Sequence, residues 1–263
     1  MKCVILAAGS STRLRPHTDD LPKTLLHVAG VPILRRTITS FLRLGVREFV
    51  IGTGYLEHLV RESVTSWFPE MVAHGHITFV SNPDYASTNN AYSLLLTREH
   101  VDAKPFVLID GDVVFDLAVV KQLVDRGTDC LAVRSVGGIG LEEVKCTADM
   151  NGRIEQIGKH VPVPSAIGES VGIELFSADS SRRLFAALHE RIRTHGLVNE
   201  YYEAAFQQII DDGVTLTGVD IGSKYASEID TYDDYQEANL HLSAQAPFDL
   251  VVTDLPWQPR FSV

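Results

Sequence analysis

Three cations cluster near the start of the chain, around a short polar loop. The loop at 8–12 follows an apolar run, Lys2–Ala7, and Arg13, Arg15 and Lys23 come soon after it. Backbone N–H groups in such a loop can point at an anion, while fixed cations neutralise its charge. In open α/β sheets, ligands bind beyond the carboxyl ends of the strands, and this loop leaves such an end. The stretch therefore predicts a phosphate-binding loop.

Two later stretches of the chain carry pairs of carboxylates in positions suited to a metal ion. Asp110 and Asp112 flank Gly111 at the end of an apolar run, where a carboxylate can hold Mg2+ on a nucleotide. Glu228 and Asp230 lie one residue apart on an extended segment, so both side chains point the same way. Asp112 is the predicted ligand with Asp110 behind it. Asp110 can equally be a turn residue at the strand end, and Asp230 stands where a helix N-cap belongs.

The opening loop resembles the signature of the nucleotidyltransferases that join a nucleoside triphosphate to a phosphorylated small molecule. It reads Ala7-Ala8-Gly9-Ser10-Ser11-Thr12-Arg13-Leu14-Arg15-Pro16, with Pro22-Lys23 after it, and Gly111-Asp112 matches a second motif of that superfamily. Ser11 departs from the signature, because glycine is usual there. The resemblance implies an α/β fold, with a Rossmann-like mixed, mainly parallel sheet flanked by helices and a small β-hairpin subdomain on the acceptor side.

The resemblance also implies roles for these residues. Arg13 and Lys23 would hold the triphosphate and the pyrophosphate that leaves, while Asp112, Glu228 and Asp230 would hold Mg2+ as the cofactor. The predicted nucleotide-binding residues are Ala7, Ala8, Gly9, Ser10, Ser11, Thr12, Gly54, Thr88, Asn89, Asn90 and Asp110.

Two further stretches narrow the subfamily. Asn82-Pro83-Asp84-Tyr85 and Thr88–Leu94 resemble a segment of the phosphocholine and 2-aminoethylphosphonate cytidylyltransferases. This resemblance favours CTP and a small anionic acceptor as the substrates. A sugar-1-phosphate nucleotidyltransferase that uses dTTP, UTP or GTP is the nearest alternative, and a catalytically inactive nucleotide-binding sensor subunit is another. A dehydrogenase is excluded because no GxGxxG follows the first strand.

The acceptor site is predicted from the second half of the chain. Glu200-Tyr201-Tyr202-Glu203 resembles an aromatic and acidic stretch of the same subfamily, and the predicted acceptor-binding residues there are Tyr201, Tyr202 and Glu203. Aromatic faces and carboxylates suit a cationic amine, although the tyrosines can also be ordinary residues of an amphipathic helix. The resemblance implies that a lysine after the hairpin holds the acceptor phosphate, and Lys159 is the first choice for it and Lys145 the second. Glu169 is a further candidate, and either lysine can be a solvated charge.

The composition excludes several classes of protein. The 263 residues carry a formal net charge of −11, which disfavours nucleic acid or an anionic membrane surface as a partner. The three cysteines form no CxxC motif, so we expect neither a disulfide framework nor a zinc site. We expect a cytoplasmic location, where cysteines stay reduced. No apolar stretch approaches the length needed to span a bilayer.

The elements expected in the first half alternate between strands and helices, which predicts a right-handed series of βαβ units. After the opening strand, the predicted strands are 47–52, 76–80 and 105–110, and the predicted helices are 32–44, 55–67 and 87–99.

Strands follow one another more closely in the second half. We predict strands at 129–136, 143–148, 153–157, 172–177 and 214–219, with a hairpin turn at Asn151-Gly152, and helices at 179–195, 200–211 and 230–242. Asp179 is the expected N-cap of its helix. One domain is expected over 1–243, with a nucleotide-binding half at 1–127 and an acceptor-binding half at 128–243. The tail at 244–263 is left open as an ordered arm, a homodimer contact or a linker.

Overall fold

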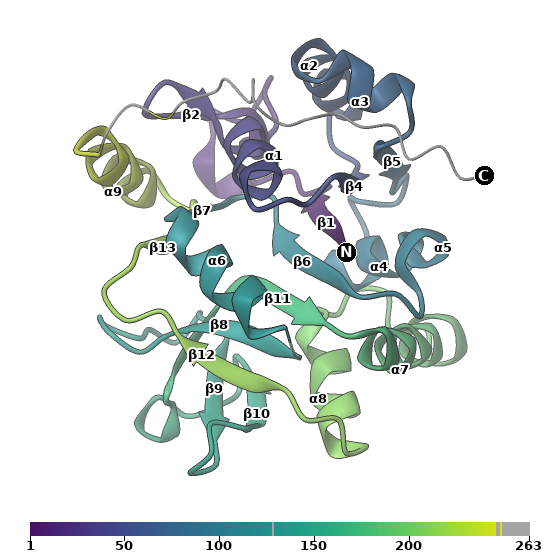
Figure 1. Cartoon of the computed structure of the whole chain (residues 1–263), viewed down its shortest axis with the longest axis vertical. Coiled ribbons are helices and arrows are strands. Elements are labelled where there is room, and N and C mark those ends of the chain that lie inside the picture. The colour runs from purple at the N-terminus through teal and green to yellow at the C-terminus, as the bar shows by residue number, and fades with distance from the viewer. Residues whose placement is uncertain (128, 246–247, 249–263) are drawn as a thin grey trace.

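The computed structural model describes residues 1–127, 129–245 and 248, and a mixed β-sheet runs through its centre (Figure 1). Within these residues the sheet has nine strands. Seven follow the order β10-β9-β11-β6-β1-β4-β5, while β8 pairs with β11 and with β12. The first half contributes parallel strands: β1 (Lys2–Ala7), β4 (Glu48–Thr53), β5 (Ile77–Ser81) and β6 (Phe106–Asp110). The mixed sheet with its parallel first half confirms the predicted α/β class.

Helices cover both faces of this parallel region. Those from the first half are α1 (Ile33–Arg43), α2 (Glu57–Trp67), α3 (Pro69–Ala73), α4 (Asn90–Leu96), α5 (Arg98–Val101) and α6 (Leu117–Arg126). Side chains alternate along a strand, so β1 serves two cores. Cys3 and Ile5 belong to the core that includes α1, α2 and α6. Val4 and Leu6 belong to the core that includes α4 and the helices of the second half. Burial on both faces explains why these strands are apolar throughout.

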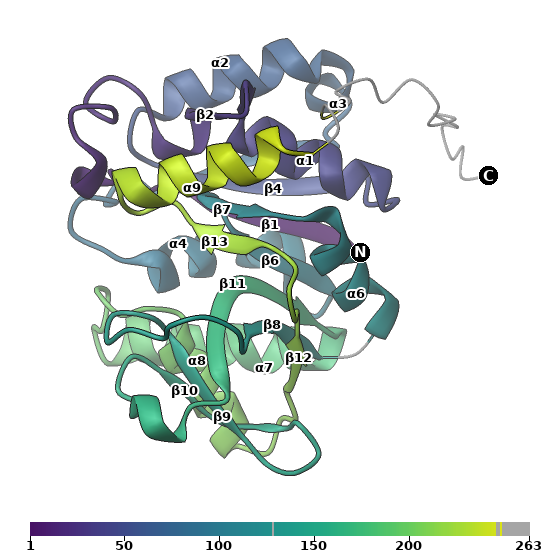
Figure 2. The ribbon, with the colours of Figure 1, turned by 90° about the vertical axis from the view of Figure 1, so that its left-hand side faces the viewer.

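Strand β11 joins the two halves of the molecule. It spans Gly168–Phe176 and pairs antiparallel with β6, β8 and β9, with an irregular register between Ser170 and Glu174. Figure 2 shows β8, β9, β10 and α8 on the far side of β11 from the parallel strands. The other elements of this half are β8 (Cys130–Arg134), β9 (Lys145–Ala148), β10 (Ile154–Gly158), β12 (Thr217–Asp220), α7 (Ala178–His189) and α8 (Glu203–Asp211), and short 3-10 (Val163–Ser165) and π-helical (Glu190–Thr194) turns. β9 and β10 form the predicted antiparallel hairpin.

A small second sheet was not predicted. Strand β7 (Val113–Phe115) pairs antiparallel with β13 (Ala226–Glu228), and α9 (Tyr232–Ser243) follows directly. This pairing brings the carboxylates that follow β6 next to those that precede α9. The remaining short elements are 3-10 turns at Thr12–Leu14 and Lys23–Leu25 and the hairpin of β2 (His27–Val28) and β3 (Val31–Pro32).

The predicted N-cap of the helix expected at 179–195 was wrong, and Asp230 does not take its alternative role as an N-cap. Ser177, not Asp179, caps α7, since the Ser177 side chain accepts a hydrogen bond from the N–H of Ser180. Thr231, not Asp230, caps α9, and it forms a reciprocal capping box with Asp234. The carboxylate of Asp230 forms ion pairs with Arg13 and Lys23 instead.

Several predicted boundaries also differ from the structure. The single helix expected at 87–99 is divided into α4 and α5, and the one expected at 179–195 ends as an α-helix at His189. The strand expected to begin at Gly172 begins at Gly168. The described helices include none that is both long enough and apolar enough to cross a membrane. Most of the tail at 244–263 lies outside the described residues, so its predicted role is not addressed by the structure.

Candidate active site

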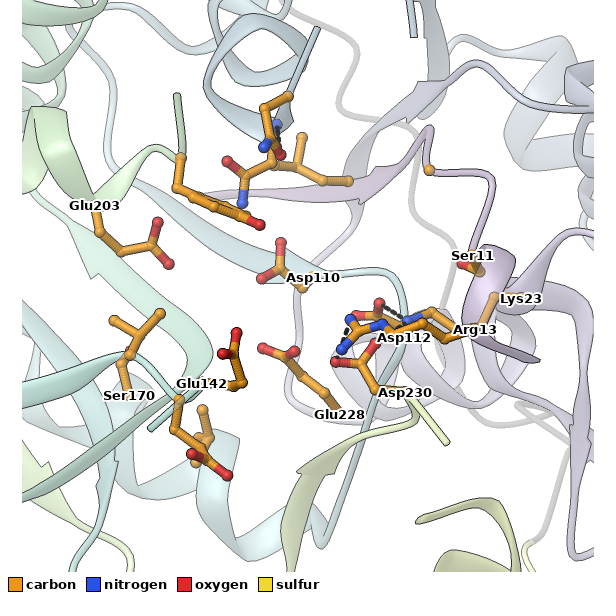
Figure 3. A pocket seen from close by; sticks show the side chains of 18 of the residues that line it. Ser11, Arg13, Lys23, Asp110, Asp112, Glu142, Ser170, Glu203, Glu228 and Asp230 are labelled. Atoms are coloured by element: carbon orange, nitrogen blue, oxygen red, sulfur yellow. Dashed lines mark hydrogen bonds and ion pairs between the residues drawn. The ribbon is translucent and has the colours of Figure 1, made fainter. Parts of the chain in front are cut away.

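A cavity of about 630 Å³ contains residues from both halves of the chain (Figure 3). The phosphate-loop end holds Ser11, Arg13 and Lys23, while Glu142, Ser170 and Glu203 lie at the other end. We call the latter the acceptor-side end. The predicted site residues that line the cavity are Ala8, Gly9, Ser11, Arg13, Lys23, Thr88, Asn89, Asn90, Asp110, Asp112, Lys159, Glu169, Tyr201, Glu203, Glu228 and Asp230.

Lys23 lies at the centre of an ion-pair cluster. Its side chain is 9% exposed, and its Nζ contacts a carboxylate oxygen of Asp112 and lies 2.9 Å from Oδ1 of Asp230. Arg13 Nη2 lies 2.7 Å from the other oxygen of Asp230. Burial alone would lower the pKa of Lys23, but the attraction of Asp112 and Asp230 outweighs it and raises the pKa above its ordinary value. Lys23 therefore stays charged at neutral pH and can neutralise a phosphate.

The loop after β1 keeps the backbone shape that glycine favours, although serine occupies the key position. Ser11 has φ 47° and ψ 51°, in the left-handed region, and its carbonyl accepts a 2.9 Å hydrogen bond from the Thr18 hydroxyl. Ser11 therefore adopts the left-handed backbone conformation that the usual glycine would allow, although it carries a side chain. Gly111 packs closely against the end of β1, because a Cβ at this position would lie 2.6 Å from the carbonyl oxygen of Leu6.

Gly54 is not among the residues that line the cavity. A Cβ on Gly54 would lie 2.8 Å from the carbonyl oxygen of Ala8, and that same oxygen accepts a hydrogen bond from the N–H of Tyr55. Gly54 thus allows the end of β4 to pack closely against the phosphate loop. Ala7, Ser10 and Thr12 are also absent from the lining, which leaves Ala8, Gly9 and Ser11 as the lining residues of the loop before Arg13.

Carboxylates crowd the middle of the cavity. Burial first, and then Asp112 and Asp230, raise the pKa of Glu228 to about 8, although Lys23 opposes the shift. Burial and the charges of Asp112 and Glu228 also raise the pKa of Asp110 well above its ordinary value, and the Tyr202 hydroxyl donates a 2.7 Å hydrogen bond to Asp110. Burial and the crowding of carboxylates therefore make Glu228 and Asp110 hold their protons more tightly than exposed carboxyl groups do.

The wall at 82–93 is a network of amides and hydroxyls. The buried Asn82 donates through its side-chain nitrogen to the hydroxyls of Thr88, at 3.0 Å, and Ser93, at 2.9 Å. Asn89 caps α4, and the side-chain oxygen of Asn90 accepts a 2.9 Å hydrogen bond from the N–H of Tyr202. This wall therefore connects the nucleotide-binding half to the predicted acceptor segment.

The acceptor-side end is rich in glutamates. Glu169 lies 2.5 Å from Arg134, and Lys159 lies 3.7 Å from Glu142 and 4.9 Å from the ring centre of Tyr201. Glu203 is 8% exposed, and burial raises its pKa to about 7, with Lys159 opposing the shift. Four residues of the predicted acceptor site therefore line the same cavity: Lys159, Glu169, Tyr201 and Glu203.

Two predicted acceptor residues do not line the cavity. Lys145 is 1% exposed, and its ammonium donates to the carbonyl oxygens of Leu141 and Glu143, each at 2.9 Å. It therefore secures the loop before β9. Tyr202 is also 1% exposed and contacts Asp110 from behind the cavity wall.

Comparison with known proteins places the chain in a family. Residues 3–201 match the model of the MobA-like NTP transferase domain. The chain belongs to this family. Its structure resembles that of the CTP:phosphocholine cytidylyltransferase from Streptococcus pneumoniae, with a TM-score of 0.72 and 22% identity, over 92% of this chain and 98% of that one. It also resembles a putative glucose-1-phosphate thymidylyltransferase from Bacillus anthracis, with a TM-score of 0.76 and 21% identity, over 95% and 98% of the two chains. These likenesses support the fold.

Curated relatives of the transferase act on more than one kind of acceptor. This chain is 41% identical over 123 residues to the CMP-5'-(3-aminopropyl)phosphonate synthase of Streptomyces rubellomurinus, and the match covers 47% of this chain and 19% of that protein. It is 31% identical over 140 residues to a UTP–glucose-1-phosphate uridylyltransferase of Haloferax volcanii, covering 52% and 55%. It is 37% identical over 112 residues to the choline-phosphate cytidylyltransferase of Streptococcus pneumoniae, covering 43% and 44%. The match spans less than two thirds of each of these relatives.

The carboxylates of Asp112 and Asp230 are oxygen ligands of the kind that Mg2+ prefers. Among the described residues, no group of three or more His, Cys, Asp or Glu side chains is placed to hold a metal ion. Asp112 and Asp230 instead share Lys23. Mg2+ in nucleotide sites is commonly held by one or two carboxylates and by the phosphates themselves. The donor set therefore fits a metal that arrives with a nucleotide.

Some cavity residues of the transferase were missed. Arg134, Glu142, Glu143, Ser170, Thr231 and Asp234 line the cavity without having been predicted as site residues. A lone arginine or serine in a strand, such as Arg134 or Ser170, gives no signal of its own in the sequence. The pair Glu142-Glu143, in contrast, follows a glycine-rich stretch where a predicted strand begins, and that position is a signal for a site.

Proposed function

We propose that this transferase moves CMP from CTP to a small acceptor that carries a phosphate or phosphonate, such as phosphocholine, 2-aminoethylphosphonate or a related alkylphosphonate, and releases pyrophosphate. One observation carries the proposal: Arg13 and Lys23 lie at one end of a cavity whose other end is lined by Lys159, Tyr201 and Glu203. The first end suits a triphosphate, and the second suits a zwitterion.

The reaction requires little chemistry from side chains. An ionised oxygen of the acceptor attacks the α-phosphorus of CTP, a new P–O bond forms, and the bond from the α-phosphorus to the bridging oxygen breaks with release of pyrophosphate. The acceptor oxygen is already an anion, so no general base is needed. Arg13 and Lys23 neutralise the leaving pyrophosphate, while Lys159 holds the acceptor anion, so catalysis comes from positioning and electrostatic stabilisation.

Mg2+ fits this proposal as a partner of the triphosphate. When bound, it would supply charge neutralisation, with Asp112 and Asp230 as its protein ligands and Glu228 nearby. Lys23 pairs with both of these carboxylates, and a metal held by them would replace its ammonium as their counter-ion. Lys23 would then be free to contact a phosphate.

The wall at 82–93 supports the preference for CTP. Side-chain amides and hydroxyls of Thr88, Asn89 and Asn90 line the cavity, and such groups can recognise the edge of a pyrimidine by donating and accepting hydrogen bonds. UTP and dTTP are the nearest competitors on this argument.

The test is an assay of pyrophosphate release with Mg2+, each of CTP, UTP, dTTP, GTP and ATP, and a panel of phosphorylated amines, aminoalkylphosphonates and sugar 1-phosphates. We expect the highest kcat/KM for CTP with an aminoalkyl phosphate or phosphonate. Activity with sugar 1-phosphates instead would favour the alternative class of transferase. Nucleotide binding without turnover on any acceptor would favour an inactive sensor.

A further inference from the structure

Buried carboxylate oxygens at the acceptor-side end have no hydrogen-bond donor among the described residues. Glu203 and Glu169 are 8% and 6% exposed, and both line the cavity. The Oε2 atom of each is buried without a partner, although Oε1 of Glu169 is paired with Arg134. Buried polar atoms in native proteins are nearly always hydrogen-bonded, and leaving one unpaired is costly. A ligand with N–H or O–H groups could therefore donate hydrogen bonds to these two oxygens.

Charge at this end also favours a cation. Glu142, Glu143, Glu169 and Glu203 line it, whereas Arg134 and Lys159 are the lining cations there. Figure 3 shows the carboxylate of Glu203 directed into the cavity, on the side away from Arg13 and Lys23. A ligand that reaches from the phosphate-loop end to Glu203 therefore meets an excess of negative charge.

The aromatic content of this end is too small for a methylated cation. Quaternary ammonium groups are bound by several aromatic faces, because they have no N–H to donate. Tyr201 is the one aromatic side chain among the described residues that line this end, and Lys159 already lies 4.9 Å from its ring centre. Tyr202 is buried behind the wall, with its hydroxyl donated to Asp110. A primary ammonium, in contrast, carries three N–H donors, which match unpaired carboxylate oxygens.

We propose that the acceptor-side end binds a primary ammonium through Glu203 and Glu169, so that the acceptor is an aminoalkyl phosphate or phosphonate and not its N-trimethylated counterpart. This inference rests on the proposed function. Lys159 would hold the phosphorus end of the same molecule. The ammonium would then stand against Glu203, keeping that carboxylate ionised.

The test compares acceptors that differ in N-methylation alone. One pair is 2-aminoethylphosphonate and its N,N,N-trimethyl derivative, and the other is phosphoethanolamine and phosphocholine. With CTP and Mg2+, we expect kcat/KM to be about 10- to 100-fold higher for the primary amine of each pair, because the methylated group leaves the carboxylate oxygens unpaired. Equal or faster turnover of the trimethyl compounds would overturn the inference. The two pairs also distinguish a phosphonate from a phosphate ester.

Calorimetry keeps this inference separate from the proposed function. If no acceptor is turned over with any nucleotide, the proposed function is wrong. Titration of the four compounds into the protein then decides the inference: selective binding of the primary amines supports it, and no binding or equal binding refutes it.

A substitution links the selectivity to Glu203. We expect Glu203→Gln to reduce the preference for the primary amine about 10-fold and to raise the acceptor KM, with the KM for CTP unchanged. Glu155→Gln removes an exposed carboxylate outside the cavity lining and should change neither value. An unaltered preference in a folded Glu203→Gln protein would contradict the role of Glu203.

Discussion

Lys23 is the residue on which the phosphate loop and the carboxylates converge. Under the proposed function, we expect Lys23→Ala to lower kcat by about 100-fold or more, because the variant loses the buried positive charge that would neutralise the leaving pyrophosphate. Steady-state kinetics of pyrophosphate release measure this loss. Lys121→Ala is the matched control, since Lys121 is an exposed lysine that pairs with Asp125 and does not line the cavity. Circular dichroism should show that both variants are folded, and near-normal turnover by Lys23→Ala would contradict its role.

Ser11 shows how one residue can keep a motif's shape at a cost. A non-glycine residue in the left-handed region carries strain of about 1 kcal/mol, so Ser11→Gly should raise the free energy of unfolding by up to that amount, less the added flexibility of the unfolded chain. Urea denaturation measures the change. Ser10→Gly is the control, because Ser10 is not among the residues with positive φ, and there glycine should destabilise slightly. A Ser11→Gly protein less stable than Ser10→Gly would show that the Ser11 side chain itself stabilises the loop.

At the scale of elements, the first turn of α8 places a carboxylate in a buried position. Burial raises the pKa of Glu203 from 4.5 to about 7, so the folded state binds this proton more tightly than the unfolded state does. The stabilisation is complete below pH 4.5 and is lost as the pH rises towards 7, with a magnitude of up to about 3 kcal/mol. Between pH 5 and pH 8, Glu203→Gln should therefore lose less stability than the unmodified protein. Denaturant melts at the two pH values test this, with Glu155→Gln as the control, and identical losses would refute it.

The elements that motifs mark were predictable, and those that depend on tertiary pairing were not. An apolar run that ends in a loop of small residues and cations predicted β1 and a loop that lines the cavity, because strand end and loop chemistry are local features. Strands β7 and β13 have three residues each, too few to show a period, and they exist because they pair with each other. Lys145 and Tyr202 were predicted in the site but are buried behind it. Register and packing determine which way such a side chain points, and neither can be read from a single position.

At the scale of the whole molecule, the cavity takes residues from both halves, which β11 joins. Ligands that bind the native state alone stabilise it by mass action, so CTP at about 100 times its Kd should add about 2.7 kcal/mol and raise the melting temperature. The carboxylates of Asp112 and Asp230 would repel a bare triphosphate, so EDTA should abolish most of this shift if Mg2+ enters with the nucleotide. Thermal melts with CTP, with CTP and Mg2+, and with CTP, Mg2+ and EDTA measure these terms, and the Lys23→Ala protein should show a smaller shift in all three. A full shift by CTP in EDTA would mean that Arg13 and Lys23 alone neutralise the triphosphate, and that the carboxylates serve the ion pairs and not a metal.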